Sequence, residues 1–329
     1  MASKDKSIFR KMIPGLALGF VALVVLMFVG DLRQVLQSLR QFNWWYFPLA
    51  LLLTLFNYLL RFCKFHFYLR QIGVTSIRWS ESLRLFVAGF PLAVTPGKVG
   101  EVLKAVWIQQ RSGLPVARGV SVVVAERISD GLAVLLLSTI GVIAYPRYWP
   151  AFGVVLVGIL GVIVVSQIRP LALWLLNLLE KLPLIWRMAH GLKEFYEGSY
   201  ALFRPKSTLL AVGLGMVSWL GEGVGFYLLL LGLGLTPSIQ LFSLAVFTLS
   251  FSTVVGAVSA LPGGLGAAEA SIAGMLSLLG GLEPALAASA TLLIRLATLW
   301  FGVGLGLLVW AFSPNLVGWK ERRDELVEG

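Results

Sequence analysis

The chain has 329 residues, of which 58% are hydrophobic and only 13% are charged, and its mean hydropathy is +0.86. This composition excludes a water-soluble protein, because a soluble domain of this length needs far more polar surface. The formal net charge of +11 would suggest nucleic-acid binding in a soluble protein. In a membrane protein, the first question is which loops hold the basic residues. One cysteine and two distant histidines leave no intrachain disulfide and no multi-histidine metal site. We therefore expect no nucleic acid, no metal and no cofactor.

Apolar segments in chain order predict an all-α, polytopic membrane protein with a single membrane domain over residues 1–329. A helix needs about 20 apolar residues to cross ~30 Å of hydrocarbon. The first segment resembles a signal peptide, but its apolar stretch is long and no small-x-small cleavage site follows it, so we interpret it as a retained span. The predicted spans are residues 12–30, 45–66, 118–144, 151–168, 207–232 and 285–312.

Two more apolar segments, 81–111 and 239–281, are each interrupted by a Pro-Gly pair. Proline lacks an N–H and glycine favours non-helical angles, so one helix should stop at each break and another should begin directly after it. We predict two re-entrant hairpins. The arms of the second hairpin are also long enough to be full spans, which would give eight in all. The residues assigned to the breaks are Pro96, Gly97, Gly100, Pro262, Gly263, Gly264 and Gly266.

Lysine and arginine are distributed unequally between the two ends of these spans. If the N-terminus is cytoplasmic, the exterior loops hold only Arg33, Arg40 and Arg147, and nearly all other basic residues face the cytoplasm. Because cytoplasmic loops carry such an excess, we expect a cell-membrane protein with both termini cytoplasmic, including a tail at 313–329. Residues 169–206 are either two helices on the cytoplasmic interface or a plain connector.

The two breaks have matched surroundings. Each contains P-G-x-x-G followed by a glutamate, Glu101 in one half and Glu269 in the other, and each precedes a span with an embedded arginine. The charge distribution predicts that the first hairpin enters the membrane from the cytoplasm and that the second enters from the exterior. The two halves would then form an inverted internal repeat. Its halves are residues 45–168 and 207–312, preceded by a first span and an interfacial segment at 1–44.

Arg127 lies within a predicted span, where a charged side chain costs at least ~2.5 kcal/mol to insert. Two interpretations are open: Arg127 binds a phosphate or another anionic headgroup, or it pairs with Asp130 or Glu126 on its own helix. Arg61 and Lys64, at the end of the second span, are expected to extend to the membrane interface.

Arg295 also lies within a span but has no acid nearby in the sequence, so Glu269, Glu222 or a substrate must neutralise it. Glu222 is a lone carboxylate within a span, predicted either to carry a proton or to pair with an arginine. Glu101 and Glu269 follow the breaks, where they either complement the helix dipole or bind a ligand. The candidate substrate-binding residues are Arg127, Arg295, Glu101, Glu126, Asp130, Glu269 and Glu222.

The motifs at 95–101, 126–130 and 261–266, followed by Glu269, carry a family resemblance. In them the chain resembles the membrane, flippase-like domain of the lysylphosphatidylglycerol synthase family, in the stand-alone form without an aminoacyl-transferase domain. The resemblance covers nearly the whole chain and implies lipid translocation or lipid handling. No nucleophile elbow, Walker A motif or H-E-x-x-H motif is present, so we expect no enzyme activity.

We therefore expect flippase-like translocation of an anionic phospholipid or a polyprenyl-phosphate-type lipid between leaflets. One alternative is a non-transporting membrane partner that presents lipid to a separate glycosyl- or aminoacyl-transferase. Another is an ion-coupled carrier of a small anion.

Overall fold

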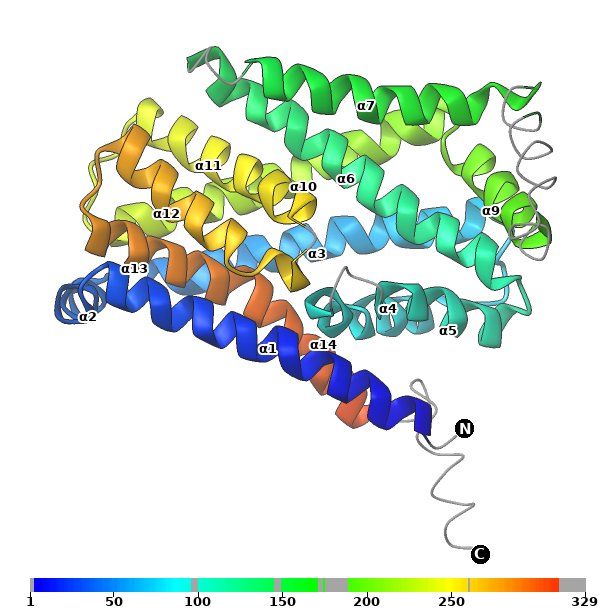
Figure 1. Ribbon diagram of the computed structural model, residues 1–329, viewed down its shortest axis with the longest axis horizontal. Coiled ribbons are helices and arrows are strands. Elements are labelled where there is room, and N and C mark those ends of the chain that lie inside the picture. The colour runs from blue at the N-terminus through cyan, green and yellow to red at the C-terminus, as the bar shows by residue number, and fades with distance from the viewer. Residues whose placement is uncertain are drawn as a thin grey trace, which may run out of the picture.

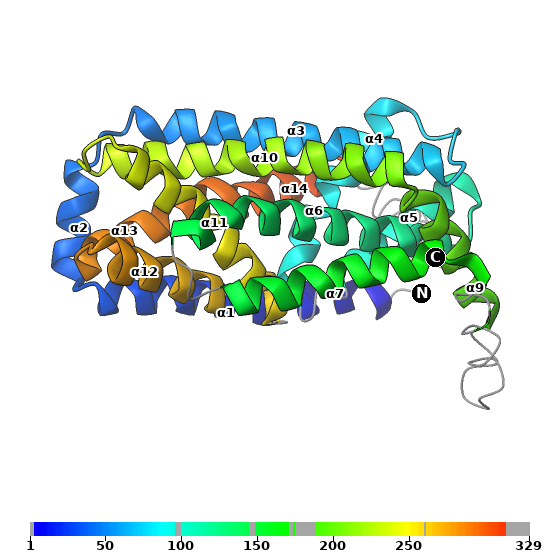
Figure 2. The same cartoon turned by 90° about the horizontal axis from the view of Figure 1, so that it is seen from above.

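The computed structural model describes residues 3–95, 100–144, 149–170, 174, 189–259 and 261–313, and this part of the chain is helical and contains no strand. The long helices run along one axis of the molecule (Figure 1, Figure 2). The helices are α1 Ser3–Val29, α2 Leu32–Gln41, α3 Tyr46–Gln71, α4 Trp79–Ala88, η1 Phe90–Val94, α5 Val102–Ser112, α6 Val116–Ala144, α7 Trp149–Gln167, α9 Ala189–Leu202, α10 Pro205–Gly232, α11 Ile239–Val258, η5 Pro262–Gly264, α12 Ala267–Gly280, α13 Pro284–Arg295, η6 Leu296–Trp300 and α14 Phe301–Phe312.

The prediction of an all-α multi-pass membrane protein is confirmed. In the described part, five helical segments are long and apolar enough to cross a membrane, or six if the bent pair at the N-terminus counts as one span. Large apolar side chains such as Leu209 and Val157 are 76% and 70% exposed on the outside of the bundle. Such residues suit contact with lipid tails rather than with water. The five segments are Tyr46–Gln71, Pro205–Gly232, Ile239–Val258, Pro262–Gly280 and Pro284–Phe312.

The second Pro-Gly break meets the end of η1, the short helix that precedes the first break. A Cβ atom placed on Gly263 of the second break would lie 3.3 Å from the side chain of Val94, the last residue of η1. Helix α1 crosses the same point, since a Cβ atom on its Gly15 would lie 1.9 Å from the Val94 carbonyl oxygen and 3.2 Å from Pro262. The two hairpins therefore approach each other from opposite ends of the molecule (Figure 1). Pro96 and Gly97 lie outside the described residues.

The arms of the two hairpins differ in length. Helices α4 and α5 have 10 and 11 residues, or about 15 Å each at 1.5 Å per residue, which is too short to cross a bilayer. This agrees with the predicted re-entrant hairpin. Helix α11 has 20 residues, and Pro262–Gly280 also has the length and hydropathy of a span. Length alone therefore allows full crossings at the second break.

Corresponding helices of the two predicted halves run in opposite directions. Helix α3 packs side by side with α10, its counterpart, and the two are antiparallel (Figure 1, Figure 2). The two helix backbones lie close together at Gly225 of α10, where a Cβ atom would be in ordinary contact with the Cα atom of Ala50, at 3.6 Å. Helix α6 likewise runs opposite to α13 and α14 (Figure 1). An inverted repeat requires these directions, and the repeat itself stays a prediction.

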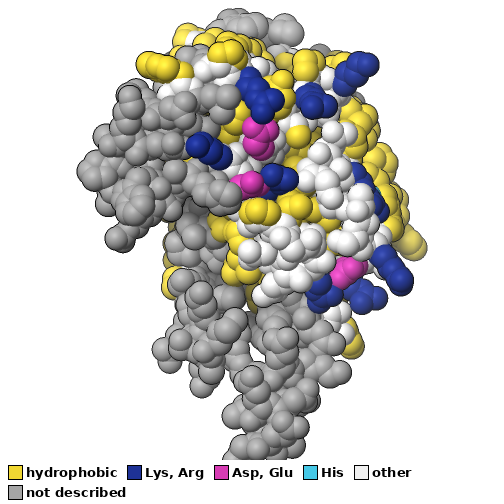
Figure 3. Space-filling view, turned by 90° about the vertical axis from the view of Figure 1, so that its right-hand side faces the viewer, with side chains coloured by type: hydrophobic (Ala, Val, Ile, Leu, Met, Phe, Trp, Pro, Cys, Tyr) yellow, Lys and Arg dark blue, Asp and Glu magenta, His cyan; other side chains and the backbone are white. Residues whose placement is uncertain are grey.

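Helix α1 begins and helix α14 ends at the same end of the molecule (Figure 1). Figure 3 shows this face, where Lys and Arg lie among apolar side chains. The opposite end carries α2, which turns 93° from α1 and holds Arg33 and Arg40. Exposed basic residues of the first end are Arg70, Arg78, Arg111, Arg169, Lys193, Arg204 and Lys206.

Candidate functional site

A cavity of about 490 Å³ lies where the two hairpins meet. Its walls come from both predicted halves: Phe86 and Ile128 belong to the first, and Leu249 and Ile272 to the second. Charged side chains line it together with these apolar ones. Of the residues predicted from the sequence, those that line the cavity are Glu101, Arg127, Asp130, Glu222, Gly263 and Arg295.

A charged pair forms hydrogen bonds with backbone groups at the second break. Nε of Arg295 donates to Oε1 of Glu269 at 2.6 Å, and Nη2 of Arg295 donates to the carbonyl oxygen of Gly263 at 3.3 Å. Oε2 of Glu269 accepts the backbone N–H of Gly266 at 2.6 Å. The pair thus satisfies one carbonyl and one N–H that the break removes from regular helix bonding. Arg295 is confirmed to pair with Glu269, one of its three predicted partners.

At the first break, a side chain also forms hydrogen bonds with the backbone. Oγ1 of Thr95 accepts the backbone N–H of Gly100 at 2.9 Å and donates to the carbonyl oxygen of Leu92 at 2.6 Å. Directly after it, Oε2 of Glu101 lies 2.9 Å from Nε of Arg127. A threonine hydroxyl therefore holds the backbone here, and among the described residues the ion-pair partner of Glu101 is Arg127.

The two Glu–Arg pairs occupy equivalent sequence positions, since 26 residues separate Glu269 from Arg295 and the same difference separates positions 101 and 127. Their surroundings differ. The side chain of Arg127 is 38% exposed, and that of Arg295 is 12% exposed. Arg127 therefore lies towards the mouth of the cavity and Arg295 lies deeper.

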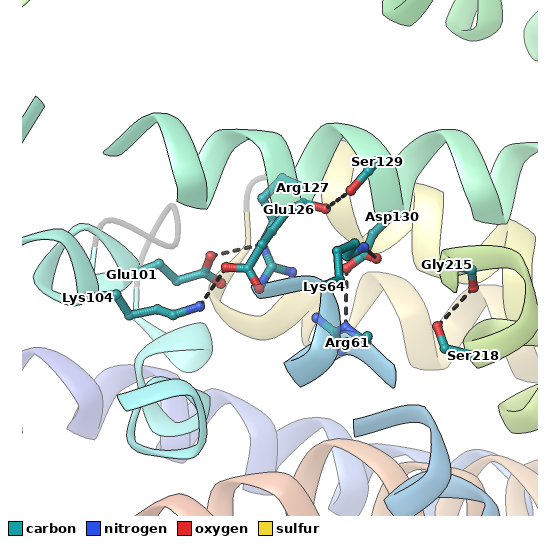
Figure 4. Close-up of polar contacts among 10 residues, drawn as sticks. All are labelled: Arg61, Lys64, Glu101, Lys104, Glu126, Arg127, Ser129, Asp130, Gly215 and Ser218. Carbon is teal, nitrogen blue, oxygen red and sulfur yellow. Dashed lines mark hydrogen bonds and ion pairs between the residues drawn. The ribbon is translucent and has the colours of Figure 1, made fainter. Parts of the chain in front are cut away.

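The predicted pairing of Arg127 with Asp130 or Glu126 is wrong. Asp130 forms ion pairs with two residues of α3 instead. Nε of Arg61 lies 3.2 Å from Oδ2 of Asp130, and the ammonium of Lys64 binds Oδ1 of Asp130. Glu126 forms an ion pair with Lys104 of α5, with 2.8 Å between Nζ of Lys104 and Oε2 of Glu126. These contacts form a row of charges along α6, with partners supplied by α3 and by the start of α5 (Figure 4).

The expectation that Arg61 and Lys64 extend to the membrane interface is also wrong. Lys64 is fully buried and Arg61 lines the cavity, with its guanidinium carbon 5.4 Å from the ring centre of Trp219. Thr54 and Asn57 lie on the same face of α3 and are buried as well. Polar residues at positions 54, 57, 61 and 64 recur at helical spacing, and this pattern could have identified a buried polar face.

Glu222 differs from the other carboxylates of the site. It is 5% exposed and lines the cavity, yet among the described residues it makes no ion pair within 4.0 Å. Glu126 and Glu269 are 1% exposed and do not line the cavity; they hold the cations Lys104 and Arg295. The seven predicted site residues are thus brought together, with Glu126 and Glu269 behind the cavity wall.

The chemistry of the site suits an anion. Guanidinium groups with several N–H donors bind phosphate or carboxylate oxygens, and three arginines from different helices face the cavity: Arg61, Arg127 and Arg295. No group of three or more His, Cys, Asp or Glu in the described part of the chain is placed to hold a metal ion.

Comparison with known proteins places the same stretch of chain in a membrane family. Residues 13–306 match the family described as lysylphosphatidylglycerol synthase TM region. The chain is also similar to a UPF0104 membrane protein of Methanothermobacter thermautotrophicus, with 25% identity over 312 residues, covering 87% of this chain and 88% of the relative. No solved structure matches the chain.

Proposed function

The chain belongs to the lysylphosphatidylglycerol synthase TM region family, and from this premise we propose that it translocates an anionic, phosphate-bearing lipid between the leaflets of the cell membrane. The family supports a role connected with membrane lipids.

One observation carries the proposal: three arginines from α3, α6 and α13 line a single cavity at the junction of the two broken hairpins. Buried arginines are costly in a membrane protein and mark sites for anions or ion pathways. Broken helices are tolerated at membrane depth mainly where they line a cavity, and transporters of the inverted-repeat class place substrate sites at such breaks.

The size and the mouth of the cavity favour a lipid headgroup. A volume of about 490 Å³ is that of a small-molecule site, enough for a phosphate headgroup but not for its acyl chains. At the exposed end of α11, Val258 lines the cavity and is 74% exposed. A headgroup held by Arg127, whose side chain is more exposed than that of Arg295, can leave its acyl chains outside, in contact with lipid.

In this proposal the two hairpins alternate in closing the cavity from opposite sides, as the halves of inverted-repeat transporters do. The end of the molecule with the basic loops faces the cytoplasm. The sequence holds no nucleotide-binding motif, so the movement runs downhill or is coupled to an ion.

A leaflet-exchange assay tests the proposal. Purified protein is placed in phosphatidylcholine vesicles with a trace of acyl-labelled fluorescent phosphatidylglycerol, and a membrane-impermeant reductant bleaches the outer leaflet. With active protein, bleaching should continue into the label that began in the inner leaflet. The double variant Glu101→Gln/Arg127→Gln removes a charge pair without leaving a buried charge unpaired, and should slow exchange at least tenfold.

The matched control is Glu81→Gln/Arg111→Gln, which removes a pair of similar length (2.6 Å) between α4 and α5 outside the cavity. It should exchange lipid at the wild-type rate. Wild-type protein that binds the labelled lipid without moving it would contradict translocation and favour presentation of lipid to a transferase. Uptake of soluble phosphate without lipid exchange would favour a small-anion carrier.

A further inference from the structure

The charges around the cavity are balanced in number, but one carboxylate is unpaired. In the described part of the chain the cluster contains five cations and five carboxylates, and Asp130 is shared by two of the cations, Arg61 and Lys64. One positive charge therefore has no carboxylate of its own. The cations are Arg61, Lys64, Lys104, Arg127 and Arg295, and the acids are Glu101, Glu126, Asp130, Glu222 and Glu269.

Glu222 is the unpaired carboxylate: Arg61 and Arg295 act on it electrostatically, but among the described residues neither forms an ion pair with it within 4.0 Å. The charged groups that act on it are Arg61 of α3, Asp130 of α6 and Arg295 of α13, and Tyr58 of α3 is the nearby neutral titratable group. The residues of α11 that line this part of the cavity, including Ser252 and Thr253, carry no charge. Because Glu222 forms no ion pair with a cation among the described residues, its carboxylate can gain a proton without breaking an ion pair.

A bound anion changes this balance. If Glu222 is ionised, the cluster is neutral, and a phosphate monoanion would add an uncompensated negative charge in a region of low dielectric. If Glu222 is protonated, the cluster carries one positive charge, which a phosphate monoanion neutralises. The anion and the proton therefore favour each other's binding, as linkage requires.

We propose that Glu222 takes up one proton for each phosphate monoanion that enters the cavity, so that lipid and proton cross the membrane together without net movement of charge. The inference rests on the proposed function and adds its energy source. The proton comes from water on the side to which the cavity is open, resides on a Glu222 carboxylate oxygen, and leaves to water on the other side. No other bond is made or broken.

This coupling predicts a direction. Lipid and proton both move towards the alkaline side, so the labelled lipid accumulates in the leaflet that faces the alkaline compartment. For one proton per lipid, each unit of pH difference changes the leaflet ratio by up to about tenfold. Because the empty cluster is neutral with Glu222 ionised and the loaded cluster is neutral with Glu222 protonated, a membrane potential should have no effect.

The test uses phosphatidylcholine vesicles containing the fluorescent phosphatidylglycerol, with a pH gradient of either sign, or with a potassium diffusion potential at equal pH. Wild-type protein should shift the leaflet ratio with the pH gradient and reverse it with the sign, and should ignore the potential. If wild-type protein exchanges lipid but the ratio ignores the pH gradient or follows the potential, the coupling is wrong and the proposed function stands. If wild-type protein moves no lipid, the proposed function itself fails.

The variant Glu222→Gln carries the charge of the protonated form. Whatever its rate of lipid exchange at equal pH, its leaflet ratio should not respond to a pH gradient. The control Glu283→Gln makes the same change at an exposed residue and should keep the wild-type response; a response retained by Glu222→Gln would overturn the proposal.

If Glu222→Gln moves no lipid, a second measurement tests whether phosphate binding is coupled to proton uptake. Dioctanoyl phosphatidylglycerol is added to detergent-solubilised protein in weakly buffered solution over a range of pH. Binding to wild-type protein and to Glu283→Gln should remove protons from solution. Binding to wild-type protein without proton uptake at any pH would overturn the proposal.

Discussion

The carboxylate of Glu269 accepts the guanidinium Nε of Arg295 at 2.6 Å and, through its other oxygen, the backbone N–H of Gly266 at 2.6 Å. The same arginine donates to the carbonyl oxygen of Gly263. Backbone groups freed by a helix break cost several kcal/mol each in hydrocarbon unless protein or water satisfies them. The pair therefore stabilises the break while it presents a guanidinium to the cavity, so one arginine serves both the fold and the site.

Breaking the two Glu–Arg pairs should have unequal effects on stability. Glu269→Gln leaves Arg295, whose side chain is 12% exposed, without a counter-charge, and should lower the free energy of unfolding by about 3–5 kcal/mol. Glu101→Gln should cost less, because the side chain of Arg127 is 38% exposed and water can hydrate it. Denaturant unfolding in detergent micelles, followed by circular dichroism, measures both. An equal or greater loss in Glu101→Gln would contradict this assignment.

Lys64 and Asp130 should show a coupling energy. Lys64 is fully buried and its ammonium binds Asp130 across the α3–α6 contact, so either single change leaves a buried charge poorly compensated. The double variant Lys64→Met/Asp130→Asn removes both charges. Its loss of stability should be smaller than the sum of the single losses by about 0.5–3 kcal/mol. Strict additivity in a double-mutant cycle would mean that the contact contributes nothing.

The spans and the breaks could be predicted from the sequence because they depend on local properties. Length and hydropathy select the segments that can cross a membrane, and Pro262 with Gly263 ends a helix whatever surrounds it. The structure has helices close to each predicted span, for example α6 at Val116–Ala144 for the predicted 118–144. The matched motifs at the two breaks also indicated that Glu269 and Arg295 correspond to Glu101 and Arg127 of the first half.

The ion-pair partners of Arg127 and Asp130 could not be predicted in the same way. Spacing along α6 favoured Asp130 as the partner of Arg127, because residues three apart share a helix face. The choice is made instead by neighbouring helices: α3 brings Arg61 and Lys64 to Asp130, and Glu101 reaches Arg127 from the start of α5. A rule that considers one helix at a time contains no information about which helix packs beside it.

Gly264 is expected to tolerate no side chain. Its φ is +68°, in the left-handed region, and a Cβ atom would lie 2.8 Å from the Cα atom of Gly256 in α11. Gly264→Ala should therefore destabilise the protein by about 1–3 kcal/mol through backbone strain, with the clash added. Gly274→Ala, within α12 and with open space around it, should be neutral or stabilising by up to about 1 kcal/mol. The same unfolding measurement compares them, and equal stabilities would refute the tight packing of the second break.

Tyr58 is expected to position Arg295 through the π-helical turn at Leu296–Trp300. Its hydroxyl donates to the carbonyl oxygen of Thr298 at 2.8 Å, a group in the turn directly after the arginine. Tyr58→Phe removes that bond and should cost about 0.5–1.5 kcal/mol of stability, and the freed turn should let Arg295 move, so lipid exchange should slow by several-fold. Tyr227→Phe is the control, because the Tyr227 ring packs edge-on against Phe242 and the described residues give its hydroxyl no hydrogen bond. An exchange rate that falls equally in both variants would show that the tyrosine acts on stability alone and not on the arginine.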